Sequence, residues 1–288
     1  MAMTIAGTGC DLLLPTHDLR SCREIERSII KKLRKETWTP FIKGIKEFEL
    51  IRDGDRIAVA ISGGKDSLLL AKMLQELHRH GMKNFDLAFI AMDPGYHPHI
   101  RKLLEDNCAH LEIPVHIFDV RIFDVVDEIS AAYPCYMCAR MRRGALYAKA
   151  QELGCNKLAL GHHYDDVVET VMLNVLCGGQ YMTMMPKLKA KNFENMELIR
   201  PMVYVREAGI IRFADTNGIS PLNCGCMVAA EKIAGKRKEI KALIQQLGAS
   251  FADVEKCIFN SARNVHMDAI LGWKTGEERH SFLDDYDR

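Results

Sequence analysis

The stretch Arg56-Ile-Ala-Val-Ala-Ile-Ser-Gly-Gly-Lys-Asp-Ser-Leu-Leu-Leu70 decides the fold of this chain. Ile57–Ile61 is a short apolar run with β-branched residues, which is typical of a buried strand in a parallel sheet. Apolar residues then recur with helical spacing from Leu68 to Leu77. The sequence therefore predicts a strand, a glycine-rich turn and a helix in immediate succession.

The turn between this strand and this helix, Ser62-Gly-Gly-Lys-Asp-Ser67, has the features of a phosphate site. Glycines let the backbone approach a phosphate closely, and the free N–H groups and dipole of a helix start favour negative charge. The two serines add hydroxyl donors, and Lys65 adds a positive charge. No Walker string, G-x-x-x-x-G-K-[ST], occurs in the chain. The alternative is a glycine turn before an ordinary helix.

Length and composition suit one α/β domain with extensions. The chain has 288 residues, 48% of them hydrophobic, and a net charge of +1, so any basic surface for nucleic acid must be local. We expect a basic helical extension over 1–50, the phosphate-binding domain over 51–222 and a helical region over 223–288. Because no apolar run approaches the ~20 residues of a membrane helix and the first residues lack a secretory pattern, we expect a cytoplasmic protein without a membrane partner.

Strands and helices are expected to alternate along the rest of the domain. The further expected strands are 85–93, 115–120, 157–161 and 196–201. The expected helices are 22–48, 97–111, 122–129, 167–176, 204–217 and 231–247. This order predicts an α/β fold, a parallel sheet with helices on both faces. Since ligands of such sheets bind outside the carboxyl ends of the strands, Met92 and Asp93 are expected beside an adenine or ribose.

A second polar cluster, Gly161-His-His-Tyr-Asp-Asp166, follows the strand at 157–161 and opens a helix. Asp165 and Asp166 fall in the first helical turn, where the helix dipole stabilises acids in any protein. The functional interpretation is that one of them holds Mg²⁺ against nucleotide phosphates. We do not expect His162 or His163 to carry a proton, because either could simply pack inward.

The ten cysteines suggest a reducing cytosol and a metal site rather than a disulfide scaffold. Cys135-Tyr-Met-Cys138 leads into an arginine-rich helix, and a second close pair, Cys224-Gly-Cys226, lies far along the chain. Four thiolates would close a tetrahedral zinc site, whereas three would hold a 4Fe–4S cluster and leave one iron open. Spacing alone does not decide between them. We expect the remaining cysteines to be dispensable, and those that lie in or beside helical apolar patterns to be buried: Cys108, Cys155, Cys177 and Cys257.

Taken in order, the motifs resemble the tRNA 2-thiocytidine synthetase family of PP-loop ATP pyrophosphatases. The resemblance rests on Ser62–Ser67, on Cys-x-x-Cys leading into Arg140-Met-Arg-Arg-Gly, on Leu160-Gly-His-His-x-Asp-Asp, on Ile199-Arg-Pro, and on the late cysteine pair. It covers about residues 30 to 270. It implies a Rossmann-like fold of the adenine nucleotide alpha hydrolase type, with helical extensions at both ends.

The resemblance also implies an activity. In that family, ATP adenylates C2 of a tRNA cytidine in the anticodon loop, sulfur carried on a 4Fe–4S cluster replaces the oxygen, and AMP and pyrophosphate are released. ATP and Mg²⁺ would be bound by Ser62, Gly63, Gly64, Lys65, Asp66, Ser67, Met92, Asp93, Gly161, His162, Asp165 and Asp166. The catalytic residues would be Lys65, Asp66, Cys135 and Cys138.

The cluster ligands implied by the family are Cys135, Cys138 and Cys226. Cys224 is the runner-up for the third position, because the family often has Cys-x-x-Cys where this chain has Cys-Gly-Cys. The expected tRNA contacts are Lys31, Lys32, Arg34 and Lys35, with Arg140, Arg142 and Arg143. Either basic group could instead be a solvated helix face.

The expected partners are tRNA and a cysteine desulfurase or other sulfide donor, and a homodimer is compatible with the sequence. One alternative is a PP-loop enzyme with a structural zinc that modifies another base, as in uridine 2-thiolation. A second is a non-catalytic nucleotide- and cluster-binding partner in sulfur trafficking. Turnover of ATP to AMP in the presence of tRNA would separate an enzyme from a binding partner.

Overall fold

The computed structural model describes residues 15–81, 83–120, 134–222, 229–284 and 286, without the side chains of 134–140 and 229–234. The described helices are α1 (Cys22–Arg27), α2 (Trp38–Glu47), α3 (Lys65–His80), α4 (Pro98–His110), α6 (Pro134–Glu152), α7 (Tyr164–Gly178), α8 (Glu207–Thr216), α9 (Ala229–Ser250) and α10 (Val254–Ser261). The described strands are β1 (Arg56–Ala60), β2 (Asp86–Asp93), β3 (Val115–Asp119), β4 (Lys157–Ala159), β5 (Lys187–Lys189), β6 (Glu197–Ile199), β7 (Gly272–Thr275) and β8 (Glu278–Ser281).

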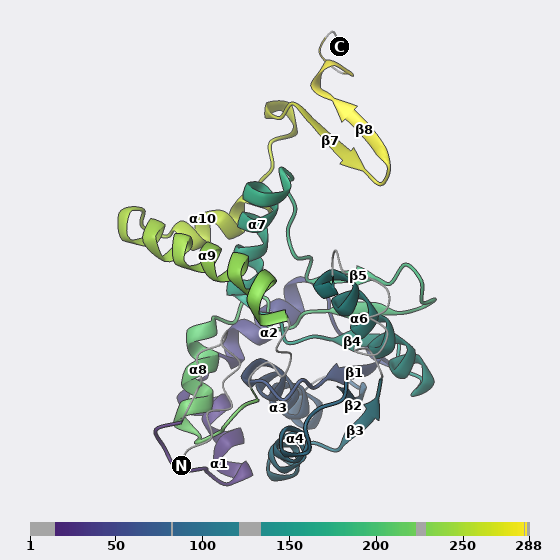
Figure 1. Cartoon of the computed structure of the whole chain (residues 1–288), viewed down its shortest axis with the longest axis vertical. Helices are drawn as coiled ribbons and strands as arrows, with labels where there is room; N and C mark the ends of the chain where they lie inside the picture. The colour runs from purple at the N-terminus through teal and green to yellow at the C-terminus, as the bar shows by residue number, and fades with distance from the viewer. Residues whose placement is uncertain (1–14, 82, 121–133, 223–228, 285, 287–288) are drawn as a thin grey trace.

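The first six strands form one sheet in the order β3-β2-β1-β4-β6-β5 (Figure 1). All neighbours pair in parallel except β5, which runs antiparallel to β6 at the edge. The chain builds outward from β1 through β2 to β3, and then crosses back to place β4 on the other side of β1. The strand order therefore reverses between β1 and β4, and such a switch point is where open α/β sheets bind ligands.

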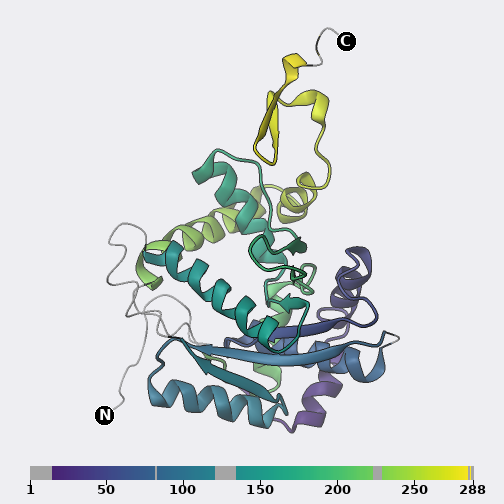
Figure 2. The same cartoon turned by 90° about the vertical axis from the view of Figure 1, so that its right-hand side faces the viewer.

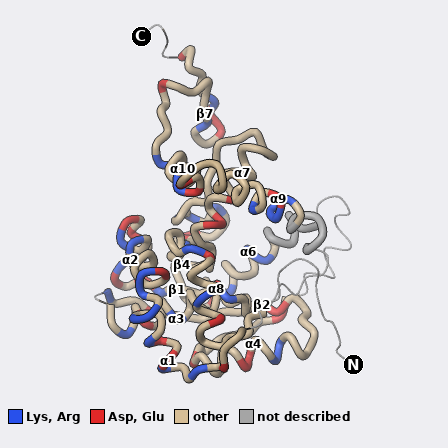
Figure 3. The backbone as a smooth tube through the Cα atoms, turned by 90° about the vertical axis from the view of Figure 1, so that its left-hand side faces the viewer, with Lys and Arg blue, Asp and Glu red and all other residues tan. Residues whose placement is uncertain are grey.

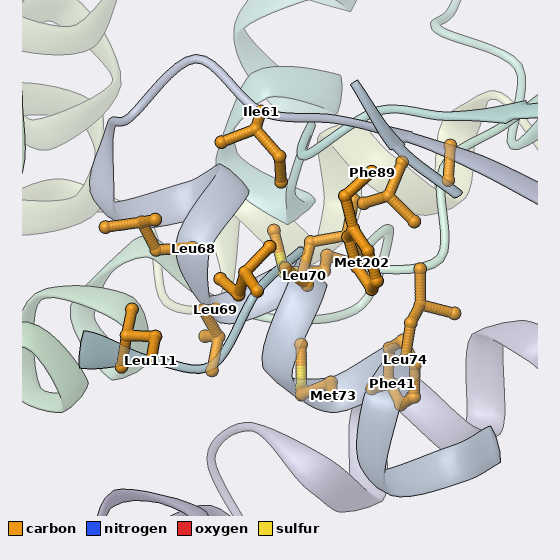
Figure 4. Close-up of a cluster of buried hydrophobic side chains, with 14 of the residues drawn as sticks. Phe41, Ile61, Leu68, Leu69, Leu70, Met73, Leu74, Phe89, Leu111 and Met202 are labelled. Atoms are coloured by element: carbon orange, nitrogen blue, oxygen red, sulfur yellow. The ribbon is translucent and has the colours of Figure 1, made fainter. Parts of the chain in front are cut away.

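Helices cover both faces of this sheet. Both faces need cover because successive apolar side chains of β1 point to opposite faces. Ile57 and Val59 point into a core shared with α1, α2, α3, α4 and α8, whereas Ala58 belongs to a second core beneath α6. Figure 2 shows α6 across one face and α4 on the other. Figure 4 shows the larger core, in which leucines of α3 meet Phe41 of α2 and Phe89 of β2. The expected α/β fold with helices on both faces is confirmed.

The segment 22–48 forms two helices rather than one. A π-helical turn at Ser28–Lys32 and a bend separate α1 from α2. Four of its apolar residues are fully buried in the same core as the sheet: Ile25, Ile29, Leu33 and Phe41. The amino-terminal helices are therefore an integral layer of the domain.

The carboxyl-terminal part combines helices with a hairpin. α9 and α10 pack on α7 through Ile240, Ile244 and Phe259, and β7 and β8 project from the body as a separate ribbon (Figures 1 and 2). The hairpin and β5 were not expected, because their strands are too short for a period-two pattern to register. In the part of the chain that the structure describes, no helix has the length and apolarity to cross a membrane.

Candidate functional site

The glycine-rich turn connects β1 to α3 and is braced by its serines. Ser67 Oγ donates to the Gly64 carbonyl at 2.9 Å and accepts from the Ser62 N–H at 3.2 Å. Gly63 has a φ of +78°, and a Cβ there would lie 2.4 Å from Leu222 Cδ1, so no other residue fits without a shift. Because α3 begins directly after Gly64, its start supplies free N–H groups at the turn.

The motif that begins at Gly161 connects β4 to α7 and touches the first motif backbone to backbone. A Cβ on Gly161 would lie 3.2 Å from the carbonyl carbon of Asp66 and 3.2 Å from the Ser67 nitrogen. Asp166 accepts the His163 N–H at 3.0 Å and so caps α7. Glycine here brings both motifs to one opening at the switch point.

A cavity of about 350 Å³ lies at this opening. Its lining combines polar groups of both motifs with apolar side chains of β1, β2 and α6. The lining residues are Ala60, Ile61, Ser62, Asp66, Ser67, Met92, Tyr96, Arg142, Leu146, Leu160, Gly161, His162 and Asp166. An apolar wall with a few convergent polar groups is the usual form of a small-molecule site.

Met92 and Asp93 end β2, but only Met92 lines the cavity. Asp93 Oδ1 accepts the N–H groups of Gly95 and Tyr96 at 2.8 and 2.6 Å, and Oδ2 pairs with Arg101 at 3.0 Å. These contacts occupy both oxygens of the Asp93 carboxylate. Asp93 therefore organises the turn that brings Tyr96 to the cavity, whereas the sequence predicted a direct contact with nucleotide.

Two lysines and two acids form a chain of ion pairs beside the cavity. Lys65 Nζ lies 3.2 Å from Asp66 Oδ1 and 3.4 Å from Glu207 Oε1, and Lys241 pairs with the other Glu207 oxygen. Burial opposes the charge of Lys65, but Asp66 and Glu207 outweigh it and raise the pKa of the ammonium. Lys65 is thus held as a cation at the turn, although its side chain does not line the cavity.

The two acids of the second motif occupy different positions. Asp165 pairs with Arg206 at 3.1 Å and accepts the Glu207 N–H at 2.7 Å, away from the cavity lining. Asp166 lines the cavity and pairs with Arg237 at 3.2 Å. Of the two, Asp166 therefore has the better position for a metal ion that accompanies a nucleotide.

Asp66 and Asp166 fit Mg²⁺ that arrives with a nucleotide. Burial raises the pKa of Asp66, while at Asp166 burial is outweighed by His163 and His162, which lower the pKa. Among the described residues, no three His, Cys, Asp or Glu side chains gather as a complete metal site. Two carboxylates suffice here, because Mg²⁺ commonly takes one or two from the protein and the rest of its ligands from phosphates and water.

His162 lines the cavity as a neutral imidazole. Its pKa is lowered to about 4, chiefly by burial, with Arg200 and Arg237 adding to the effect and Asp166 opposing it. Arg200 Nε donates to His162 Nδ1 at 3.4 Å. Burial lowers the pKa of Arg200 to about 10, which still leaves a cation at neutral pH. The His162–Arg200 pair therefore supplies a fixed donor and a positive charge near the second motif.

The arginines of α6 do not form one surface patch. Arg142 lines the cavity, and its buried Nε has no hydrogen-bond partner among the described residues. Arg143 is exposed, and the side chain of Arg140 lies outside the described part. A buried donor without a partner is costly unless a ligand accepts from it. The structure therefore places Arg142 at the cavity, whereas the sequence placed it on tRNA phosphate.

The second group of basic residues, at positions 31–35, lies on the surface as the sequence predicted. Lys31 and Lys32 end the π-helical turn, and Arg34 and Lys35 follow it. All four residues are exposed around the buried Leu33. Figure 3 shows Lys and Arg distributed over the fold, with Asp and Glu among them.

The cysteines expected at a metal lie outside the described side chains. Cys135 and Cys138 belong to the first turns of α6, and Cys224 and Cys226 fall within residues 223–228. Among the other cysteines, Cys22, Cys108 and Cys155 are buried, whereas Cys177 and Cys257 are exposed. The expectation that Cys177 and Cys257 are buried is wrong: Cys177 lies in the last turn of α7, which is exposed throughout, and Cys257 is exposed next to Lys256 on α10.

The sequence did not predict several residues that the structure places at the site. Glu207 lies far from Lys65 along the chain, and no local pattern signals their pairing. Tyr96 and Leu146 reach the cavity from a turn and a helix whose packing only the fold defines. Arg200 belongs to the Ile-Arg-Pro motif, which is one of those that resemble the family. That motif did not predict the contact of Arg200 with His162.

Known proteins resemble this chain over most of its length. A family model described as a PP-loop domain matches residues 31–221. A tRNA-cytidine(32) 2-sulfurtransferase of Syntrophotalea carbinolica is 37% identical over 86% of this chain and 94% of the relative. The enzyme of that name from Geobacter sulfurreducens is 40% identical over 80% of this chain and 89% of the relative.

A solved structure resembles the fold. It is the U34-tRNA thiolase NcsA from Methanococcus maripaludis with its [4Fe-4S] cluster, with a TM-score of 0.64 and 23% identity over 83% of this chain and 78% of that chain. At this identity the likeness concerns the fold, whereas the sequence relatives and the PP-loop match define the family. This chain belongs to the PP-loop family and, within it, to the tRNA-cytidine(32) 2-sulfurtransferases.

Proposed function

We propose that this chain is an ATP-dependent, AMP-forming sulfurtransferase that converts a tRNA cytidine to 2-thiocytidine. The observation that carries the proposal is the cavity at the β1/β4 switch point, which both ATP motifs of the family line. The names of the relatives supply the substrate, a cytidine at position 32 of tRNA. The two motifs supply the nucleotide chemistry.

Different regions of the cavity suit different parts of ATP. The apolar wall around Met92 and Leu146 suits an adenine, and the turn at Ser62–Ser67 suits the pyrophosphate part. Asp66 and Asp166 would hold Mg²⁺, which would neutralise charge that develops on the phosphates. Arg142 lines the same space with its positively charged side chain and would stabilise the α phosphate.

Adenylation makes the cytidine oxygen a leaving group. The base oxygen attacks the α phosphate, the bond to the β phosphate breaks, and pyrophosphate leaves from the glycine turn. Sulfur then forms a bond to C2, and AMP departs with the former base oxygen. Because a stacked base hides its C2 position, the cytidine must be splayed out of its loop.

The sulfur chemistry of the proposal follows from the cysteine motifs that resemble those of the family. Cys135, Cys138 and Cys226 would bind a 4Fe–4S cluster, whose fourth iron would present sulfide from a cysteine desulfurase or other donor. α6 supports this arrangement, because it begins at the cysteine pair and brings Arg142 to the nucleotide cavity one turn after Cys138. We assign the enzyme to the cytoplasm, and a homodimer remains compatible with the proposal.

Product analysis tests the nucleotide chemistry. We expect AMP and pyrophosphate, formed only with tRNA, and 2-thiocytidine in the tRNA when sulfide is supplied. Lys65→Ala should reduce AMP formation by at least about 100-fold, because a charge positioned at transferring phosphates is worth this much. ADP as the main product would exclude the proposal.

Anaerobic purification tests the cluster. We expect a brown protein with iron and sulfide, and loss of cluster and thiolation on substitution of Cys135, Cys138 or Cys226. Cys224→Ala is the matched control and should keep the cluster. Stoichiometric zinc without iron, with all four cysteines equally required, would favour the structural-zinc alternative.

A further inference from the structure

Glu207 contacts both nucleotide motifs from a distant part of the chain. It is the first residue of α8, and its Oε1 lies 3.4 Å from Lys65 Nζ in the first motif. Its backbone N–H donates to Asp165 of the second motif at 2.7 Å. The side chains of Lys65 and Glu207 are 18% and 20% exposed, so solvent screens this pair only partly.

We propose that Glu207 is a positioning residue for Lys65, whose carboxylate fixes the direction of the lysine ammonium at the phosphate-binding turn. The inference rests on the proposed function for the reaction that it serves. The contact itself does not depend on that reaction. Glu207 need not touch ATP or tRNA for this role.

The physical need for such a residue lies in the lysine side chain. An unbranched four-carbon stem has many rotamers, and ordering it costs up to about 2 kcal/mol. Asp66 lies next to Lys65 on the same helix and restrains the ammonium from one side, whereas Glu207 comes from another helix. Contacts from two elements restrict the ammonium to a narrow region, and small errors in the position of a charge lower the rate of phosphate chemistry.

The partner of Glu207 explains why this acid does not cancel the charge of the turn. Lys241 of α9 pairs with the second oxygen of Glu207, so Lys241 offsets the negative charge that Glu207 adds beside the turn. Burial opposes the ionised form of Glu207, but Lys241, Lys65 and His163 outweigh it and lower its pKa. Lys65 therefore keeps a positive charge for an additional anion.

Replacing Glu207 should remove one of the two restraints on the Lys65 ammonium. In Glu207→Gln the ammonium keeps its contact with Asp66 on the same helix and loses the carboxylate that reaches it from α8. Lys241 loses its carboxylate partner in the same variant. The lysine side chain should therefore adopt more rotamers at the turn, and a smaller share of them should place its charge productively.

Two further variants separate positioning from a general effect on the protein. Glu207→Asp keeps the carboxylate on a shorter side chain, so it should retain part of the contact with Lys65. Glu239→Gln is the matched control, since Glu239 pairs with Lys236 on the outer side of α9 with both side chains exposed.

The kinetics of nucleotide turnover by the full chain test the inference. Glu207→Gln should lower kcat about 10- to 100-fold with a smaller change in KM for ATP. Glu207→Asp should recover part of the kcat, and thermal unfolding checks that each variant folds. An unchanged kcat in folded Glu207→Gln, or no recovery in folded Glu207→Asp, would overturn the inference. A lowered kcat with ADP as the product would support the positioning role and refute the proposed function instead.

Discussion

Gly161 is the residue at which the two nucleotide motifs meet. A side chain there would press on the backbone of Asp66 and Ser67 at 3.2 Å, and backbone at the start of a buried helix cannot move aside cheaply. The spacing of the two motifs, and with it the width of the cavity, therefore depends on the absence of one methyl group.

Gly161→Ala should lower the free energy of unfolding by about 1–3 kcal/mol, which is typical of overpacking, and should weaken ATP binding. The control is Gly144→Ala in α6, where a Cβ meets nothing within 4 Å. That substitution should stabilise by about 0.5–1 kcal/mol, because alanine is favoured over glycine in a helix. Urea unfolding of both variants measures the difference, and equal effects would contradict the close approach.

Glu169 is a buried acid that the proposed mechanism does not use. It lies on α7 one turn after Asp166, and Arg237 Nε lies 3.6 Å from its Oε2. Burial raises its pKa from 4.5 to about 7, with Asp166 adding to the effect and Arg237 opposing it. The folded protein therefore binds this proton more tightly than the unfolded chain does.

Because the folded pKa of Glu169 is raised, its contribution to stability is complete below about pH 4.5 and is lost as the pH rises through about 7. Glu169→Gln should remove this loss, so its free energy of unfolding should exceed that of the parent at pH 8 by up to about 3 kcal/mol. The two proteins should converge near pH 4.5. Glu105→Gln, on the exposed face of α4, should follow the parent. Denaturant unfolding between pH 4.5 and 8 measures all three, and parallel curves for the parent and Glu169→Gln would refute the assignment.

Lys72 joins three elements inside the protein. Its side chain on α3 is fully buried, and Nζ donates to Glu26 of α1 at 2.7 Å and to the Leu111 carbonyl after α4 at 2.8 Å. Cys22 Sγ lies 3.4 Å from the same Nζ. This cation fixes the amino-terminal helix layer to the nucleotide-binding core.

Lys72→Met should lower the free energy of unfolding by about 1–3 kcal/mol, because the buried Leu111 carbonyl loses its donor and Glu26 keeps only its pair with Arg79. The control is Lys102→Met, which breaks an exposed pair with Asp106 on α4 and should change stability by less than about 1 kcal/mol. Thermal or urea unfolding compares them. A loss for Lys72→Met no larger than for Lys102→Met would show that the buried contact is not structural.

Sequence patterns predicted those elements that neighbouring residues in the chain determine. The strand–turn–helix around Ser62–Ser67 follows from glycine geometry and apolar spacing, and the second motif opens α7 as expected. Short strands such as β5 and the β7–β8 hairpin carry too few residues for such a pattern. Contacts like Lys65–Glu207 depend on which elements the sheet order brings together, which no single stretch encodes.

The charge of the whole molecule restricts how it can bind tRNA. A net charge of +1 gives no general attraction to phosphate, and Figure 3 shows acidic and basic positions interspersed over the fold. With Arg142 in the nucleotide cavity, the exposed run at residues 31–35 is the larger of the two surface groups that the sequence assigned to tRNA.

Replacing Lys31, Lys32, Arg34 and Lys35 with glutamine should therefore weaken tRNA binding and flatten its salt dependence. The slope of log K against log salt should fall by about one for each cation that contacts phosphate, and thus by up to about four. The control carries four equivalent changes scattered over exposed positions: Lys102, Lys191, Lys256 and Lys274. Filter binding at several salt concentrations, with ATP binding measured alongside, compares the variants. The run at 31–35 contacts phosphate only if its variant loses slope and the control does not. An equal loss in both would mean that the charges act through net charge alone, and no loss in either would leave 31–35 as a solvated helix face.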